Sequence, residues 1–435
     1  MMKRLLLCSL AALSLITACD KKEILTGKRE EIAGVTAIKR GIPSDRSTLA
    51  EPLNLTPPVR TSAYTDIAYN KQHNSPNHEN VSFSKLVWES SLGRGPINSN
   101  IVISAGYIYA IDAGGTLICI SQADGKKVWE KPIARQPDEA VFSGGLTIEN
   151  GILYIATNIG TVHAIDSRTQ KEVWDCKIKY PLKGAPLFVA GKVIVTSIIN
   201  HIFAINARSG TVEWTMAAND EQTTMADAGT PAVFGDSVIC PCSSGDVKAF
   251  NIHTGTENWD DMLYSSDMFA SGAVISHIVV SPLVFGRYVL VVTSEAKMVL
   301  LDAASGNRVW ELEIGTMHPP VENNGWIFML TSSDELLCIS SRSGAIRWAS
   351  NIKDTLLKDG TKAEDLMVSG PLLINGDVVV FSNTGSVLVM NASTGNLKAQ
   401  LKPEAFKNLG VIKTPVIVDR FAYVVSQNGD ICKVG

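Results

Sequence analysis

From about residue 80 to its end, the chain alternates short apolar runs with polar turns that contain glycine, and the arrangement repeats. One unit has the apolar runs 151–156 and 162–166, separated by the turn 158–160, and it ends at Val173 and Trp174. Runs of this length between glycine turns predict β-strands joined as antiparallel hairpins. A unit of this kind that recurs along the chain is typical of a β-propeller, in which each repeat forms one blade.

Most tryptophans share one position of the repeat. They are Trp88, Trp129, Trp174, Trp214, Trp259, Trp310 and Trp348, and Trp326 alone lies outside this register. A glycine stands four residues before five of them, at Gly125, Gly210, Gly255, Gly306 and Gly344, whereas Gln170 takes its place in one repeat. A large aromatic at one place per blade is expected to be buried between neighbouring sheets rather than to stack on a ligand.

The two ends of the repeat region complete each other. Near the C-terminus Gly395 is followed by Ala399, so one repeat has lost its tryptophan. Trp88 begins a strand without inner strands before it, while the runs 421–425 and 430–434 lack an outer strand after them. The sequence therefore predicts an all-β fold, an eight-bladed β-propeller of four-stranded antiparallel blades. Pairing of the N- and C-terminal strands would close it and leave only short edges.

The start of the chain predicts export. Lys3 and Arg4 precede the apolar run 5–15, which is too short to span a bilayer, so residues 1–18 are expected to be a signal peptide. Residues 16–19 resemble the bacterial lipobox, in which the cysteine, here Cys19, is acylated. An ordinary signal peptide cut nearby is the alternative. Acyl chains would anchor the protein to a membrane without a spanning segment.

Residues 19–65 are polar, charged and proline-bearing, and we expect a flexible tether with an end-to-end distance of about 35–40 Å. Within this tether, a short ordered segment around residues 32–38 is an open alternative to full flexibility. Residues 66–435 are assigned to the propeller. Asp20 resembles an inner-membrane retention signal of enteric bacteria, which leaves the choice between the inner and the outer membrane open.

Charge and cysteines narrow the function. The formal charge of −4 becomes −6 once Lys3 and Arg4 are removed with the signal, and no dense basic run exists, so nucleic acid is not an expected partner. Cys240 and Cys242 lie two apart on a predicted strand, near the distance limit for a disulfide, and two free thiols are favoured over a bond.

No catalytic or metal-binding motif is present, so no catalytic, cofactor-binding or metal-ligating residue is predicted and no cofactor is expected. His163 occupies a repeat position that Phe203 and Lys248 also occupy, which favours packing over a role as a base. His73 and His78 lack the partner spacing of a metal site. Three aspartates and two asparagines are expected to cap turns rather than to form an active site: Asp112, Asp166, Asp302, Asn206 and Asn251.

The glycine–tryptophan repeat over residues 82–435 resembles the pyrroloquinoline-quinone (PQQ) type of propeller repeat. Together with the lipobox and tether it resembles the BamB family of outer-membrane assembly lipoproteins, and residues 69–78 resemble the loop before the first blade in its α-proteobacterial branch. The resemblance implies a non-catalytic scaffold that binds the BamA insertase and its complex, and helps to deliver β-barrel precursors.

The resemblance places the family's docking loop at residues 224–229, where Met225 and Asp227 are candidate contacts but the family's arginine is missing. The next loop, 260–276, carries large apolar residues. Those named as candidate contacts are Met262, Tyr264, Met268 and Phe269. Such residues either form a partner surface or fold back on the blade.

Two other functions stay open. The first is a PQQ-dependent quinoprotein dehydrogenase, whose family usually adds an adjacent cysteine pair, a calcium site and a catalytic aspartate; Cys240 and Cys242 are not adjacent. The second is an envelope binding protein of another purpose, for peptidoglycan or a small ligand.

Overall fold

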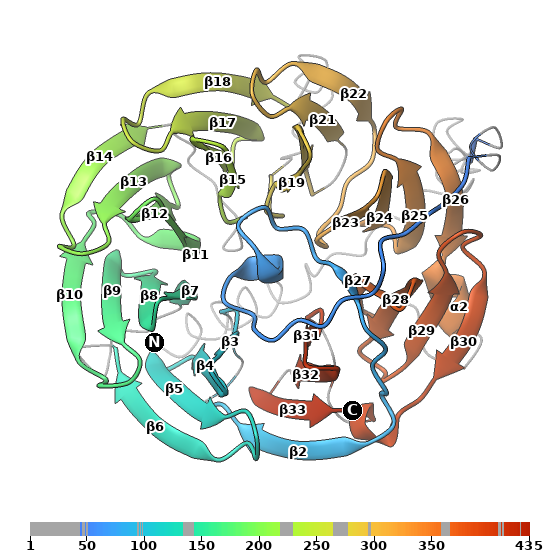
Figure 1. The fold of residues 1–435 in the computed structure, drawn as a ribbon, viewed down its shortest axis with the longest axis horizontal. Helices are drawn as coiled ribbons and strands as arrows, with labels where there is room; N and C mark the ends of the chain where they lie inside the picture. The colour runs from blue at the N-terminus through green and yellow to red at the C-terminus, as the bar shows by residue number, and fades with distance from the viewer. Residues whose placement is uncertain are drawn as a thin grey trace, which may run out of the picture. The chain divides into compact units, whose positions relative to one another are not determined.

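A computed structural model describes residues 44–45, 48, 51–93, 95, 97, 99–133, 143–217, 229–263, 277–294, 297–357, 366–407, 410, 413–426 and 428–435. The signal peptide, Cys19 and Asp20 lie outside this part of the chain, as does the ordered piece considered at 32–38. The described residues from 44 onward form eight antiparallel sheets arranged in a ring (Figure 1). This confirms the predicted eight-bladed β-propeller.

Each blade has four consecutive antiparallel strands, numbered from the channel outward, except the last. Blade 1 consists of β3 (Val102–Ser104), β4 (Tyr107–Ile111), β5 (Thr116–Ser121) and β6 (Lys127–Pro132). Blade 2 consists of β7 (Ser143–Glu149), β8 (Ile152–Thr157), β9 (Thr161–Asp166) and β10 (Glu172–Lys177). Blade 3 consists of β11 (Leu182–Val189), β12 (Lys192–Ser197), β13 (His201–Asn206) and β14 (Val212–Ala217). Blade 4 consists of β15 (Ala232–Phe234), β16 (Ser237–Pro241), β17 (Asp246–Asn251) and β18 (Glu257–Met262).

The remaining blades follow the same order. Blade 5 consists of β19 (Leu283–Phe285), β20 (Tyr288–Val292), β21 (Met298–Asp302) and β22 (Arg308–Leu312). Blade 6 consists of β23 (Val321–Asn323), β24 (Trp326–Leu330), β25 (Glu335–Ser340) and β26 (Ile346–Asn351), followed by helix α2 (Ile352–Leu357). Blade 7 consists of β27 (Val368–Ile374), β28 (Asp377–Ser382), β29 (Val387–Asn391) and β30 (Leu397–Leu401), followed by the 3-10 helix η6 (Glu404–Phe406).

Blade 8 closes the ring with strands from both ends of the chain. It consists of β31 (Val416–Val418), β32 (Phe421–Val425), β33 (Asp430–Val434) and, on the outside, β2 (Leu86–Ser91). β2 is antiparallel to β33, with Ser91 opposite Asp430, and the amide of Gly435 donates to the carbonyl of Lys85 at 3.0 Å. The predicted closure is therefore confirmed.

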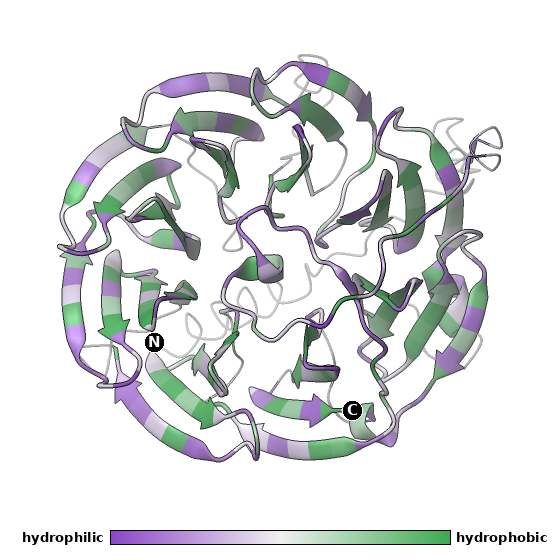
Figure 2. Cartoon of the chain, in the orientation of Figure 1, coloured by the Kyte–Doolittle hydropathy of each residue, from purple (hydrophilic) through white to green (hydrophobic). Residues whose placement is uncertain are grey.

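Burial follows the position of a strand within its blade. The second strand β8 is buried along almost its whole length, whereas the outer strand β14 alternates exposed and half-buried residues. Figure 2 shows the same contrast between apolar inner strands and mixed outer strands. The inner strands lie between two neighbouring sheets, so both of their faces are apolar.

The turns between first and second strands lie on one face of the propeller, and the connections between blades lie on the other, which we call the loop face. Residues 51–85 cross the first face before entering β2 (Figure 1). They include the short 3-10 helix η3 (Ile67–Tyr69) and β1 (Asn77–His78), which pairs in parallel with β27.

The N-terminal strap, meaning described residues 45, 48 and 51–56, is bound to blade 6. The guanidinium of Arg347 donates to the carbonyls of Thr48 and Glu51, both at 2.7 Å, and lies 4.8 Å from the ring centroid of Trp326. The amide of Thr56 donates to Asn323 Oδ1 at 2.7 Å. The described part of the expected tether is thus packed on the propeller, which moves the boundary at residue 65 toward the N-terminus.

Candidate partner-binding site

In sequence, the candidate docking residues lie at the end of β18 of blade 4 and in the segments that follow β14 of blade 3 and β18. Met262 ends β18, is 45% exposed, and its carbonyl accepts a hydrogen bond from Arg308 of blade 5. The others, Met225, Asp227, Tyr264, Met268 and Phe269, lie outside the described residues. Met262 is therefore the candidate contact whose surroundings can be described.

The described residues that follow these two connections are joined to each other. The amide of Thr230 donates to Ser281 Oγ at 2.9 Å, and Thr230 Oγ1 accepts from the amide of Ala185 at 3.0 Å. A Cβ atom at Gly229 would lie 2.6 Å from the carbonyl oxygen of Val280, so glycine is needed for this approach. Blades 3, 4 and 5 are consequently fixed to one another where the two connections re-enter the fold.

A buried lysine strengthens the same region. Lys183 of β11 is 4% exposed, and its Nζ donates to Asn200 Oδ1 at 2.9 Å and to Ser243 Oγ. The carbonyl of Ser243 is in turn hydrogen-bonded to Nδ1 of His277. Burial lowers the pKa of Lys183 to about 8, because desolvation disfavours the ammonium. The lysine thus joins the turns of blades 3 and 4 at an electrostatic cost.

Cys240 and Cys242 are free and fully buried beside this lysine, in agreement with the prediction of two thiols. Cys242 Sγ lies 3.9 Å from the carbonyl oxygen of Cys240. Burial raises the pKa of Cys242 to about 12 and that of Cys240 well above its usual value. Because the thiolate is the reactive form, both thiols are expected to be inert in the folded protein.

The other candidate residues have structural contacts. His163 Nδ1 lies 2.7 Å from Glu172 Oε1, and the same cross-strand pairing recurs between Lys248 and Glu257 at 3.1 Å. A position that makes the same cross-strand contact with a glutamate in two blades supports packing over base catalysis. Among the described residues, no group of three or more His, Cys, Asp or Glu side chains could hold a metal ion.

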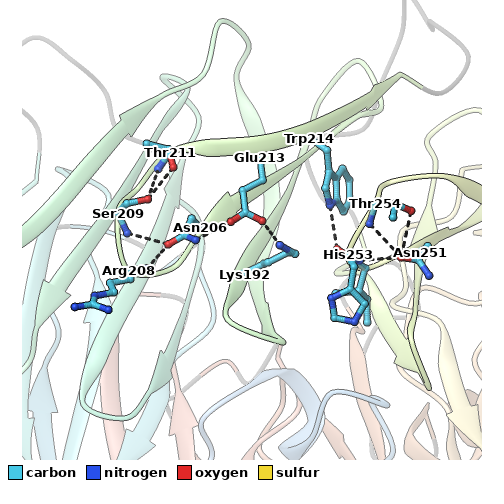
Figure 3. Close-up of polar contacts among 11 residues, drawn as sticks. Lys192, Asn206, Arg208, Ser209, Thr211, Glu213, Trp214, Asn251, His253 and Thr254 are labelled. Atoms are coloured by element: carbon cyan, nitrogen blue, oxygen red, sulfur yellow. Dashed lines mark hydrogen bonds and ion pairs between the residues drawn. The ribbon is translucent and has the colours of Figure 1, made fainter.

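The predicted turn caps are present, with one difference. Asn206 Oδ1 accepts from the amides of Arg208 and Ser209, and Asn251 caps the equivalent turn of blade 4 (Figure 3). Asp166 and Asp302 cap the same turn in blades 2 and 5. Asp112 differs from these four residues. Its side chain accepts a hydrogen bond from the amide of Thr116 at 2.7 Å and caps the turn between β4 and β5, because Asp112 follows the second strand of its blade rather than the third.

Residues 83–137 and 133–350 match the family model described as outer membrane protein assembly factor BamB. The chain belongs to the BamB family. It is 20% identical over 366 residues to the outer membrane protein assembly factor BamB of Yersinia pestis, covering 82% of this chain and 90% of that protein. The corresponding protein of Escherichia coli is 22% identical over 368 residues, covering 82% and 91%.

Solved structures show the same fold. BamB from Moraxella catarrhalis has a TM-score of 0.67 at 17% identity, over 80% of this chain and 98% of that one. A quinohemoprotein alcohol dehydrogenase from Comamonas testosteroni has a TM-score of 0.65 at 12% identity, over 89% and 82%. The similarity to these two structures shows that the chain folds as a propeller. A BamB and a dehydrogenase share this fold, so the fold alone is compatible with either function.

Sequence reasoning missed the attachment of the described residues 45, 48 and 51–65 to the propeller. One signal was present: Trp326 lies outside the tryptophan register, and the structure places it under Arg347, the residue that binds the strap. Arg347 binds main-chain carbonyls of the strap, so the side chains of Thr48 and Glu51 give little further sign of this attachment.

Proposed function

We propose that this chain is a non-catalytic, lipid-anchored scaffold of the β-barrel assembly machinery. It binds a BamA-type insertase and assists insertion of β-barrel proteins into the outer membrane. The observation that carries this proposal is the match of residues 83–350 to the BamB family. Relatives that align with most of the chain are named outer membrane protein assembly factors.

The proposed docking surface is the loop face of blades 3 to 5. The candidate contacts are Met225, Asp227, Met262, Tyr264, Met268 and Phe269. The Thr230–Ser281 hydrogen bond and the contacts of Lys183 support this choice, because they fix the three blades where both connections re-enter the fold. Because the blades beneath these connections are fixed, less conformational entropy is lost when a partner binds there.

Anchoring by acylated Cys19 is part of the same proposal. It would hold the scaffold on the periplasmic face of the outer membrane, with Asp20 as the argument for the inner membrane. Among the described residues, no helix is long and apolar enough to cross a bilayer.

A quinone-dependent dehydrogenase fits the described residues poorly. Cys240 and Cys242 are separated by Pro241 and buried, so they do not supply the adjacent pair of that family. In the described part of the chain, no three or more His, Cys, Asp or Glu side chains come together in a group that could hold a metal ion.

Affinity purification of the tagged, full-length protein from detergent extracts tests the proposal. We expect the insertase to be recovered, and the substitution Met262→Asp to reduce its recovery several-fold. Val173→Asp is the matched control, since Val173 is 51% exposed on the outer strand of blade 2. Failure to recover an insertase with the unmodified protein would refute the proposal. So would sustained dye reduction with alcohols or sugars after addition of the quinone and calcium.

A further inference from the structure

Residues 59–79, which we call the N-terminal clasp, make one circuit of the channel mouth (Figure 1). Main-chain hydrogen bonds join it to the inner strands of successive blades. The partners are Thr61 with Asp419 in blade 8, Tyr64 with Ile103 in blade 1, Thr65 with Ile148 in blade 2, Lys71 with Val233 in blade 4, Gln72 with Val284 in blade 5, and His78 with Asn375 in blade 7. Asn74 bonds Glu322 of blade 6, and Lys71 Nζ lies 5.2 Å from the ring of Phe188 in blade 3.

Two imidazoles are buried where the clasp meets the blades. His73 is 3% exposed, with Nδ1 at 3.1 Å from the carbonyl of Pro282. His78 is 1% exposed, with Nε2 at 3.1 Å from Ser75 Oγ. The second ring nitrogen of each, Nε2 of His73 and Nδ1 of His78, is buried without a hydrogen-bond partner among the described residues. A protonated imidazole has two N–H donors, so each site satisfies the neutral ring and leaves the charged ring one acceptor short.

The charged groups around the clasp pair with one another instead. Glu149 of β7 pairs with Lys71, and Glu322 of β23 bonds Asn74. At blade 8, Asp419 pairs with Arg60 and Arg420 pairs with Glu79. The ring centroid of the buried Tyr69 lies 4.7 Å from that of His78. No carboxylate hydrogen-bonds either imidazole in the described structure, so protonation would not be compensated.

We propose that the clasp is an acid-releasable element: protonation of His73 and His78 detaches residues 59–79 from the channel mouth while the eight blades stay folded. The clasp can detach from the channel mouth without unfolding the blades, because the segments before and after it have their own attachments to the propeller. Arg347 binds the strap before it, and β2 pairs with β33 after it. Release would uncover the inner edge of β27 and an apolar cavity of about 70 Å³.

That cavity lies between the clasp and blades 6 to 8. Its walls include Tyr64 and Tyr69 from the clasp, and Pro319, Pro320, Pro371 and Pro415 from blades 6 to 8. Proline has no N–H group, so these residues cannot donate main-chain hydrogen bonds to the clasp.

The direction of the pH effect follows mainly from three buried groups. Burial lowers the pKa of His73 and His78 from 6.5 to about 4, so acid favours the released state, in which both imidazoles can take up a proton. Burial raises the pKa of Asp66 in the clasp from 3.8 to about 7, so this carboxyl opposes release in acid. Burial also raises the pKa of Glu322, which bonds Asn74 of the clasp and adds a smaller opposing contribution. The two imidazoles outweigh these carboxyls, and the net increase in release between pH 7 and 4.5 is roughly several-fold by linkage.

Hydrogen–deuterium exchange of the full-length protein in detergent, corrected for the intrinsic pH dependence of exchange, tests this inference. We expect peptides from residues 59–79 to open roughly several-fold more often at pH 4.5 than at pH 7, while peptides from β8 and β9 stay protected. Unchanged or increased protection of the clasp in acid would overturn the proposal. Simultaneous loss of protection in clasp and blades would also overturn it, because that would be global unfolding.

Variants make the test specific. The quantity to compare is the ratio of clasp opening at pH 4.5 to clasp opening at pH 7, not the protection at one pH. The double substitution His73→Gln and His78→Gln leaves the carboxyls of Asp66 and Glu322, whose pKa values burial raises, so acid should now tighten the clasp and the sign of the effect should reverse. Asp66→Asn removes the larger opposing contribution, and acid release should increase further. His253→Gln is the matched control, since this imidazole is more than half exposed in a turn of blade 4. A double variant that keeps the acid release of the unmodified protein would overturn the assignment.

Discussion

The indole of Trp214 in blade 3 lies directly against Gly255 in blade 4, so that a Cβ atom at Gly255 would be 2.8 Å from Cδ2 of the ring. The same indole donates from Nε1 to the carbonyl of Ile252 at 3.0 Å (Figure 3). The arrangement recurs around the ring: six of the seven register tryptophans pack under the glycine turn of the following blade, and Trp129 is the exception because Gln170 replaces that glycine. The pairs are Trp88–Gly125, Trp174–Gly210, Trp259–Gly306, Trp310–Gly344 and Trp348–Gly395.

This relationship explains why the tryptophan is lost at Ala399. A tryptophan there would meet the turn between the third and fourth strands of blade 8. Those strands are β33 and β2, which are far apart in sequence, so no such turn connects them. The substitution in blade 7 is therefore a consequence of how the ring is closed.

Gly255→Ala is expected to destabilise the protein by about 2–4 kcal/mol. About 1–2 kcal/mol comes from the positive φ of 74° and the rest from overlap with Trp214. Gly235→Ala is the matched control, since Gly235 also has a positive φ, of 56°, but nothing lies within 4 Å of its added Cβ. Urea denaturation should show the larger loss for Gly255→Ala. Equal losses would mean that contact with the indole contributes nothing.

Gln170→Gly is expected to stabilise the protein by about 1 kcal/mol. Gln170 occupies the position that is glycine in most other repeats and has a positive φ of 60°, which strains a residue with a side chain. Its carbonyl accepts a hydrogen bond from Lys131, which glycine would retain. The urea midpoint should rise without a change in the m-value. A lower midpoint would show that the glutamine side chain makes a compensating contact.

The repeated features were predictable because each blade must bury the same faces. The tryptophan register, the glycine turns and the unmatched strands at the two ends were sufficient for the blade count and the closure. The clasp was not predictable, since it has no periodicity and its partners lie up to hundreds of residues away, as with Tyr69 and Ile417. The role of Lys183 was equally hidden, because nothing near it in sequence shows that Ser243 would meet its amine.

Arg347→Ala is expected to free the strap. The substitution removes both hydrogen bonds to the carbonyls of Thr48 and Glu51 and uncovers the ring of Trp326. Limited proteolysis should then cut within residues 45–56 at least several times faster than in the unmodified protein. Arg287→Ala is the control, since this guanidinium is 72% exposed and pairs with Asp302 away from the strap. If both variants are cut at the same rate, Arg347 does not hold the strap.

The stability contributed by Lys183 should depend on pH in a defined window. Its pKa is about 8 in the folded protein, against 10.5 for a solvated lysine, so the unfolded chain binds more protons between these values. Stability therefore rises with pH from 8 to 10.5, by at most about 3 kcal/mol. Other groups also titrate in this range. The measured quantity is thus the difference in unfolding free energy between the unmodified protein and Lys183→Met. That difference should move in favour of the unmodified protein as pH rises from 8 to 10.5, because the buried amine becomes neutral and keeps its contacts with Asn200 and Ser243. A difference that stays flat across this window would show that the buried amine titrates as it does in the unfolded chain.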